Sequence, residues 1–247
     1  MLLTTFPSPV EFDRAVVVLE GLGAEYRRID PTPALARVAG GALVMDRDTR
    51  EKISSSAPGI VFSGWIEYRP ATVTMPDGSP PDNAPACFGR SAIMVLQPCV
   101  ADDTKIRLVA HLDGDLSEVL PYMNAVMPLA SYVPGSKTLT YMDKHRMIVL
   151  YPRRITIAKA DEIVDAWLTL DGIRRLAEET WANRARIEPC FTTRKKPPAL
   201  EIFKRLPRTN CGLCGEPTCM AFAMRLWAGE ASVRKCTPVF EPANAGM

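Results

Sequence analysis

The pattern of apolar and polar residues divides residues 1–70 into short strands and two helices. Between residues 12 and 22, apolar side chains recur at steps of three and four, which predicts an amphipathic helix. Ser8, Pro9 and Glu11 precede this helix as N-cap, first-turn proline and capping-box glutamate. A shorter helix is expected near residues 49–54, and strands are expected at residues 2–6, 24–29, 42–45 and 59–66. This order of elements predicts a small ferredoxin-like α/β domain.

Residues 89–187 mix the same kinds of element in a second α/β domain. Strands are expected at residues 91–97, 106–112, 139–142, 147–151 and 154–158. Asp115 and Glu118 have the spacing of a capping box, and apolar residues from Leu116 to Met123 predict a helix there. The longest element is an amphipathic helix over about residues 160–187, in which Gly172 is expected to weaken or bend the helix.

Two proline-rich stretches separate these regions. Residues 71–88 contain four prolines, and residues 188–198 contain three prolines around a run of basic residues. Because proline donates no backbone hydrogen bond and interrupts regular elements, we expect both stretches to be linkers. Residues 199–242 then form a small helical module. The predicted fold class is therefore α/β (α+β), with two small α/β domains followed by this module.

The composition limits the classes of protein to which the chain can belong. The chain has 247 residues, of which 47% are hydrophobic and 23% are charged, the usual balance of a soluble globular protein. A formal net charge of +2 gives no indication of a nucleic-acid partner. No apolar run approaches the roughly 18–20 residues needed to span a bilayer, and the first residues lack the basic region of a secretory signal. We therefore expect a cytoplasmic protein, in a compartment where thiols stay reduced.

Four of the seven cysteines are concentrated near the end of the chain. Their spacing is Cys211-x2-Cys214-x4-Cys219-x16-Cys236. A cubane cluster requires four thiolates that converge on one centre, and a tight loop can supply three of them. Gly212 and Gly215 suit such a loop, because wrapping a cluster calls for unusual φ values. The clustering favours metal ligation over a disulfide framework, and it predicts one [4Fe–4S] cluster.

A structural zinc site is the alternative for these four cysteines. Zinc sites with four cysteines usually show two C-x2-C pairs, and only one such pair is present here, so the cluster is favoured. Cys87, Cys99 and Cys190 are interpreted as packing or incidental residues, because none has a second cysteine close by. His111 and His145 are more simply structural or solvent-facing than catalytic. We find no convincing catalytic triad, Walker loop or Rossmann glycine pattern.

Residues 206–219 read LPRTNCGLCGEPTC. This segment resembles the four-cysteine module of the corrinoid iron–sulfur protein large subunit, and a similar module occurs in the B subunit of a membrane-bound, ferredoxin-linked electron-transport complex. In both families the module holds one low-potential [4Fe–4S] cluster that passes single electrons. The resemblance implies that Cys211, Cys214, Cys219 and Cys236 are the ligands. Residues 106–124 are similar to uncharacterised bacterial iron–sulfur proteins. Residues 1–70 resemble a sulfur or selenium carrier domain more loosely, but residues 34–45 lack the cysteine usual in that family.

The function favoured by these features is one-electron transfer to or from a metalloprotein partner, with the upstream domains providing docking. Basic residues crowd around the module and would offset the negative charge of the cluster, steer an acidic partner, or form an ordinary solvated surface. They are Arg194, Lys195, Lys196, Lys204, Arg205, Arg208, Arg225, Arg234 and Lys235. The alternative function is that of an accessory factor for metallocofactor assembly or insertion. An enzyme that uses the cluster as a Lewis acid would need an open iron site with three ligands, whereas four cysteines are present here.

Overall fold

The computed structural model describes residues 1–81, 87–194 and 197–244. The chain forms two compact units. The first comprises Met1–Tyr141 and Arg146–Thr193, and the second comprises Arg194–Met247 together with Met142–His145. Among the described residues, none of the helices combines the length and apolar character that crossing a lipid bilayer requires.

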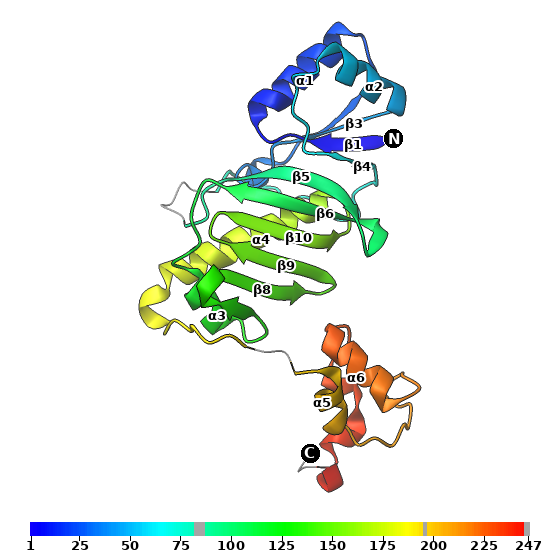
Figure 1. Cartoon of the computed structure of the whole chain (residues 1–247), viewed down its shortest axis with the longest axis vertical. Coiled ribbons are helices and arrows are strands. Elements are labelled where there is room, and N and C mark those ends of the chain that lie inside the picture. Colours follow the sequence, from blue (N-terminus) through cyan, green and yellow to red (C-terminus); the bar gives the residue numbers. More distant parts are fainter. Residues whose placement is uncertain (82–86, 195–196, 245–247) are drawn as a thin grey trace. The chain divides into compact units, whose positions relative to one another are not determined.

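The first sheet is four-stranded and antiparallel, with the strand order β2-β3-β1-β4. Its strands are β1 (Leu2–Thr5), β2 (Arg27–Ile29), β3 (Ala42–Met45) and β4 (Trp65–Glu67). Helices α1 (Pro9–Gly21) and α2 (Arg47–Ser56) lie on the same side of this sheet (Figure 1). From α1, Phe12 and Leu19 pack against Leu43 and Met45 of β3. This strand order with two helices confirms the predicted ferredoxin-like arrangement.

The start of α1 follows the signals in the sequence. Ser8 is the N-cap, and its hydroxyl accepts a hydrogen bond from the Glu11 N–H at 3.3 Å. Pro9 occupies the first turn, where its missing N–H would have no partner within the helix. The local sequence therefore predicts the start of α1 correctly.

The strand predicted at residues 59–66 begins only at Trp65, and the residues before it join the two sheets. The Ser63 N–H donates to the Thr5 carbonyl at 2.9 Å, and the Leu96 N–H donates to the Ser63 carbonyl at 2.8 Å. At Gly64, with φ +137°, an added Cβ would lie 2.1 Å from the Leu96 carbonyl oxygen. The backbone at Ser63 and Gly64 therefore lies directly against Leu96. The periodicity of apolar residues cannot predict a contact between residues so far apart in the sequence.

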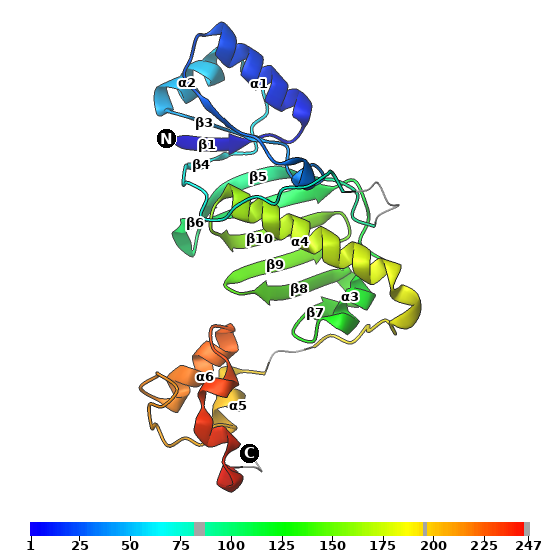
Figure 2. The ribbon, with the colours of Figure 1, turned by 180° about the vertical axis from the view of Figure 1, so that it is seen from behind.

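The second sheet has the strand order β5-β6-β10-β9-β8-β7. Its strands are β5 (Ser91–Cys99), β6 (Asp102–Leu112), β7 (Ser131–Val133), β8 (Thr138–Asp143), β9 (Arg146–Tyr151) and β10 (Arg154–Ala160). The long helix α4 (Ile163–Ala182) lies across one face of the sheet (Figure 2), and its Trp167 and Leu170 are buried against Leu108 and Ile157. The three-residue strand β7 is too short for the sequence pattern to predict.

The helix expected after Asp115 begins later than its capping-box spacing predicts, and the capping-box prediction is wrong. Helix α3 spans Leu120–Val126, with Val119 at its N-cap. The Asp115 carboxylate accepts a hydrogen bond from the Ser117 N–H at 2.8 Å. An aspartate that bonds two residues ahead forms an Asx turn, which competes with helix initiation at the same point.

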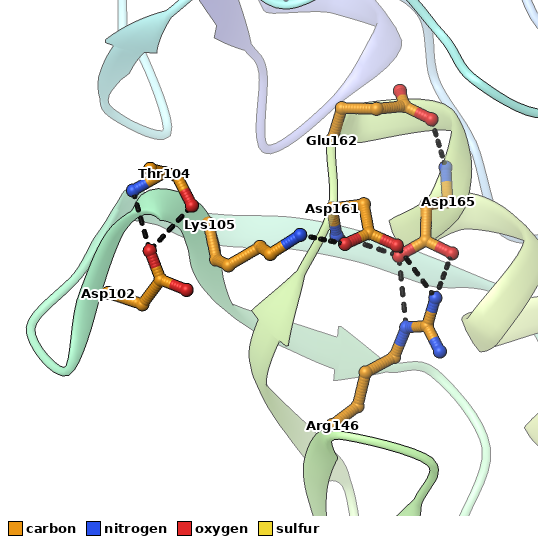
Figure 3. Close-up of polar contacts among 7 residues, drawn as sticks. All are labelled: Asp102, Thr104, Lys105, Arg146, Asp161, Glu162 and Asp165. Carbon is orange, nitrogen blue, oxygen red and sulfur yellow. Dashed lines mark hydrogen bonds and ion pairs between the residues drawn. The ribbon is translucent and has the colours of Figure 1, made fainter.

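A buried ionic network fixes the start of α4 against β9 and β10 (Figure 3). The Arg146 Nε donates to Asp165 at 3.0 Å, and its second nitrogen contacts Asp161 at 3.3 Å. Lys105 forms an ion pair with Asp161. Glu162 is the N-cap of α4, and its carboxylate accepts hydrogen bonds from the first backbone N–H groups of the helix. These hydrogen bonds and ion pairs offset the free-energy cost of burying charged side chains.

The two sheets share one hydrophobic core. Leu3 and Val44 of the first sheet belong to the same buried cluster as Leu96 and Leu108 of the second. The domain boundaries proposed from the sequence, 1–70 and 89–187 with linkers at 71–88 and 188–198, stay predictions. Residues 82–86 of the first linker and 195–196 of the second lie outside the described residues.

The described residues 197–244 of the C-terminal unit contain two helices and several short turns. The helices are α5 (Ala199–Lys204) and α6 (Cys219–Ala228), and 3₁₀ turns follow at Val233–Lys235, Thr237–Phe240 and Pro242–Asn244. Helix α6 ends at Gly229, where φ is +80° and the Glu230 N–H donates to the Arg225 carbonyl at 2.9 Å. This is a Schellman motif, for which glycine is the preferred residue. The small helical module predicted at the end of the chain is confirmed.

Candidate metal centre

The loop that carries the first cysteines is wound by residues with positive φ. These residues are Arg208 at +60°, Asn210 at +51°, Gly212 at +75° and Gly215 at +87°. The Gly215 N–H donates to the Gly212 carbonyl at 2.9 Å, which closes a tight turn that contains Cys214 and directly follows Cys211. A backbone that curls in this way turns its N–H groups inward, as anion-binding loops do. Gly212 and Gly215 therefore have the conformational role that the sequence predicts.

Asn210 ties this loop to the start of α6. Its side-chain oxygen accepts a hydrogen bond from the Cys219 N–H at 2.8 Å. Thr218 caps the same helix through the Ala221 N–H at 3.0 Å. Cys219 is therefore the first residue of α6, where the N-terminal end of the helix dipole favours a thiolate.

Cys236 returns the chain to this region and is buried, with 4% of its surface exposed. Burial is the main cause that raises the pKa of the Cys236 thiol, and the charges of Cys214, Cys219 and Cys211 raise it further. The N–H of Val239 acts in the opposite direction. Cys236 therefore lies in the apolar part of this unit, in the same buried cluster as Cys219 and Phe222.

Cys211 differs from the other three cysteines because it is exposed. The Leu213 N–H, and after it the Thr209 hydroxyl, hydrogen-bond to its sulfur and lower the pKa of the Cys211 thiol. Hydrogen bonds to thiolate sulfur are among the factors that set the potential of an iron–sulfur cluster. The four cysteines therefore occupy environments that range from solvent to a buried apolar core.

The donor set suits an iron–sulfur cluster. Cys219 and Cys236 lie within a buried apolar cluster with Leu206 and Phe222, and Cys214 packs against it. Soft thiolate donors, partly shielded from water and hydrogen-bonded by backbone N–H groups, are the usual ligands of such clusters. Among residues 1–81, 87–194 and 197–244, no group of three or more Cys, His, Asp or Glu side chains has the arrangement of a site for a single metal ion.

The remaining cysteines lie elsewhere, in the first compact unit. Cys99 is buried at the end of β5, as a small packing residue would be. Burial is the main cause that raises the pKa of Cys87 to about 11, and the charge of Glu178 adds to it. A thiol with so high a pKa stays protonated and is a poor ligand or nucleophile. The Cys190 N–H donates to the Pro121 carbonyl at 3.0 Å.

Two of the basic residues near the cysteines form ion pairs, although their side chains are also exposed. Lys204 pairs with Glu201 at 2.6 Å, and Arg225 pairs with Glu216. The side chains of a second group are exposed, and these are Arg205, Arg208, Arg234 and Lys235. Lys195 and Lys196 lie outside the described residues. Exposed cations therefore flank the cysteine loop and the turn before Cys236.

Residues 206–238 match the protein family described as "Putative Fe-S cluster". This segment is an iron–sulfur cluster region. The chain is 52% identical over 48 residues to the corrinoid/iron-sulfur protein large subunit of Moorella thermoacetica, a match that covers 19% of this chain and 11% of that protein. It is also 51% identical over 51 residues to the acetyl-CoA decarbonylase/synthase complex subunit gamma of Methanocaldococcus jannaschii, covering 19% of this chain and 10% of that subunit.

The chain spans only about a tenth of the length of these relatives, so the likeness concerns the C-terminal segment alone. No solved structure gives a significant match. The predicted resemblance to the corrinoid iron–sulfur protein is confirmed, and a [4Fe–4S] cluster agrees with both comparisons. All four cysteines of the motif fall within residues 206–238.

Sequence reasoning missed Asn210. Asparagine is among the few residues besides glycine that adopt left-handed φ without large strain. Asn210 lies directly before Cys211 and nine residues before Cys219, whose N–H donates to its side chain. An asparagine at this place in the motif is the signal that could have identified it.

Proposed function

We propose that Cys211, Cys214, Cys219 and Cys236 bind one [4Fe–4S] cluster, and that this protein transfers single electrons to or from a metalloprotein partner. The observation that carries the proposal is the burial of Cys219 and Cys236 in one small apolar cluster, against which Cys214 packs, within the segment that matches the iron–sulfur family. A bound cluster supplies one-electron redox chemistry, while the chain holds, shields and orients it.

The unequal exposure of the cysteines supports electron transfer. Cys219 and Cys236 are buried, whereas Cys211 is exposed and lies beside Leu213, whose side chain is 68% exposed. A cluster held by these residues would have one edge near solvent and the rest against protein. Such an edge allows close approach of a partner without full exposure of the cluster to water.

The exposed charges support a partner with an acidic surface. Arg205, Arg208, Arg234 and Lys235 flank the cysteines, and they would partly offset the negative charge of a cluster with four thiolate ligands. Complementary charge increases the rate at which partners meet and fixes their orientation. The relatives named as subunits of the acetyl-CoA decarbonylase/synthase complex work within a larger assembly, which supports a metalloprotein partner here.

The ligand set is tested by replacing one buried cysteine. We expect Cys236→Ser to lower the iron content of anaerobically purified protein and to change its electron paramagnetic resonance spectrum after reduction. Cys190→Ser is the matched control, because Cys190 lies outside the motif, and it should leave both unchanged. Unchanged iron content and spectrum in Cys236→Ser would refute the assignment.

The redox role is tested separately from the ligand set. We expect the reduced protein to return one electron per chain to an oxidised acceptor protein while its iron content stays constant. Transfer of the cluster itself to an acceptor apoprotein would instead assign the chain to metallocofactor assembly, and it would overturn the electron-transfer proposal.

A further inference from the structure

The second sheet has one covered face and one open face. Helix α4 packs on the covered face. Figure 1 looks onto the opposite face, where no helix among the described residues of the first compact unit crosses β5, β6, β10 or β9. Open faces of antiparallel sheets usually carry polar side chains, because alternate residues of each strand point to solvent. The middle of this face departs from that pattern.

A row of β-branched residues, which we call the valine row, crosses the middle of the open face. In the strand register, Val95 of β5 lies opposite Val109 of β6. Thr156 of β10 lies between Val109 and Val149 of β9. The residues on either side of Val109, Thr156 and Val149 are buried in the core, so the row points away from α4. All four side chains of the row are half-buried.

One arginine lies on each side of the valine row. Arg107 belongs to the next row in one direction, and its guanidinium donates to the Gln97 side chain at 2.6 Å. Arg154 belongs to the next row in the other direction, and its guanidinium lies 4.2 Å from the centre of the Tyr151 ring. Both arginines are exposed, and none of the residues in these three rows is acidic. The face therefore presents an apolar strip between two cations.

The open face is hollowed beside the valine row. A depression of about 280 Å³ is lined by residues of the row together with Arg107, Ala158 and Met147. The small side chain of Ala158 lies between Arg107 and Met147 in the strand register, which leaves room there. Met147 is 48% exposed, and its flexible thioether side chain adapts to the shape of a partner. The face can therefore receive apolar side chains from another molecule.

We propose that this face binds an acidic amphipathic helix of a partner protein. The apolar stripe of that helix lies along the valine row, and carboxylates on its two sides pair with Arg107 and Arg154. The row crosses four strands and is roughly 14 Å long at about 4.8 Å per strand. About ten residues of helix, at about 1.5 Å per residue, have that length. The proposal concerns a surface separate from the cysteines and rests on no part of the proposed function.

The charges favour an acidic helix over two other occupants. A second copy of the chain would bring the arginines of both copies to one interface, where like charges repel. A single-stranded nucleic acid requires aromatic rings on which its bases stack, and the valine row contains none. A helix with glutamates beside an apolar stripe complements both the strip and the cations.

Binding is tested on the full-length, iron-loaded protein with designed helical peptides of about 18 residues. Each peptide carries a leucine stripe, which glutamates flank in the acidic peptide and lysines in the basic one. We expect the acidic peptide to saturate one site in fluorescence anisotropy and to shift the methyl resonances of Val95, Val109 and Val149. The basic peptide, and a scrambled acidic peptide without a stripe, should bind at least about tenfold more weakly. Equal binding of either one, or no saturation by the acidic peptide, overturns the proposal.

Charge reversal separates the site from a general loss of structure. Arg107→Glu combined with Arg154→Glu should weaken binding of the acidic peptide by about tenfold or more and strengthen binding of the basic peptide by a similar factor. An unfolded variant would not gain binding. Arg47→Glu combined with Arg69→Glu is the matched control, because both are exposed arginines outside the three rows. The same reversal in the control would reduce the effect to net charge and overturn the site.

The valine row is tested by replacements that keep the β-branched shape. Val109→Thr combined with Val149→Thr should weaken binding of the acidic peptide by about three- to tenfold and leave iron content constant. Val10→Thr combined with Val17→Thr is the control, because these valines of α1 are 65% and 67% exposed. Equal losses in the two double variants would contradict the proposal. Light scattering on the same samples detects self-association, and a dimer that Val109→Thr with Val149→Thr dissociates would assign the face to a second copy and overturn the proposal.

Discussion

The first compact unit and the C-terminal unit are stabilised by different means. In the first, buried side chains from two sheets and α4 form one continuous core. In the second, the described buried cluster consists of Leu206, Cys219, Phe222, Ala223 and Cys236, so two of its five members are cysteines. A segment this small buries too little apolar surface to offset its conformational entropy without a metal or another cross-link. We therefore expect the first unit to fold from its own core and the module to depend on iron bound by its thiolates.

Removal of the metal should produce the largest difference between the two units. We expect the iron-free chain to lose hydrogen-exchange protection throughout α6, because ligand-binding energy becomes folding energy in small metal-binding modules. Amides of β6 and α4 should keep their protection. Hydrogen exchange measured by mass spectrometry on the iron-loaded and iron-free protein checks this prediction. Persistent protection of α6 without iron would show that its small apolar core suffices.

Removing a large buried side chain from the core of the first compact unit should destabilise that unit and leave the C-terminal unit unaffected. Trp167 is 1% exposed within the core shared by the two sheets. We expect Trp167→Ala to lower the free energy of unfolding of the first unit by about 3–5 kcal/mol and to leave iron content unchanged. Urea unfolding followed by far-ultraviolet circular dichroism measures the loss. Val17→Ala is the control, because Val17 is 67% exposed, and a similar loss there would contradict the role of burial.

A smaller effect is expected at Asn210, which combines a positive φ with a hydrogen bond to the Cys219 N–H. Asn210→Gly removes only the hydrogen bond, whereas Asn210→Ala also forces alanine into a left-handed conformation. We expect Asn210→Ala to be less stable than Asn210→Gly by about 1 kcal/mol. The rate of iron release to a chelator compares the two variants. Equal rates would show that the backbone conformation at this position contributes nothing to iron retention.

The smallest effect concerns the ionic network of the first unit and its dependence on pH. Burial raises the pKa of Glu162, and the backbone N–H groups of Val164 and Asp165 oppose this change. The folded protein therefore binds this proton more tightly than the unfolded chain does. The stability that Glu162 contributes is present below its ordinary pKa of 4.5 and is lost as the pH rises through its folded value.

Glu162→Gln does not titrate, so it provides the comparison. We expect the difference in unfolding free energy, wild type minus variant, to decrease as the pH rises from about 4 to about 7. Urea unfolding at a series of pH values measures this difference. An increase over the same range would mean that the hydrogen bonds from the Val164 and Asp165 N–H groups outweigh the burial of the carboxylate.

Local signals explain which parts of the fold could be predicted from the sequence. The start of α1 depends on Ser8 and Pro9, which act within one turn. The start of β4 depends on the approach of Gly64 to Leu96, thirty-two residues away in the chain, so periodicity alone misplaces it. Asp115 is a third case, because its side chain can form either a helix capping box or an Asx turn, and the Asx turn is the one that forms.

The same distinction applies to the sites. The spacing of Cys211, Cys214, Cys219 and Cys236 is a one-dimensional feature, and the sequence alone therefore indicates iron–sulfur chemistry. The burial of these cysteines is different, because Leu206 and Phe222 join Cys219 and Cys236 in one apolar cluster only after folding.

The glycines of this protein should differ in their tolerance to substitution during evolution. At Gly64 any side chain would collide with the Leu96 carbonyl oxygen, so a saturation library should return glycine alone at that codon. At Gly212 and Gly215 an added Cβ would meet no protein atom within 4 Å, so the positive φ is the main restriction that the chain itself imposes, and asparagine or aspartate are the replacements expected there. Natural variation is thus expected to be narrower where the two sheets meet than in the loop that carries the first cysteines.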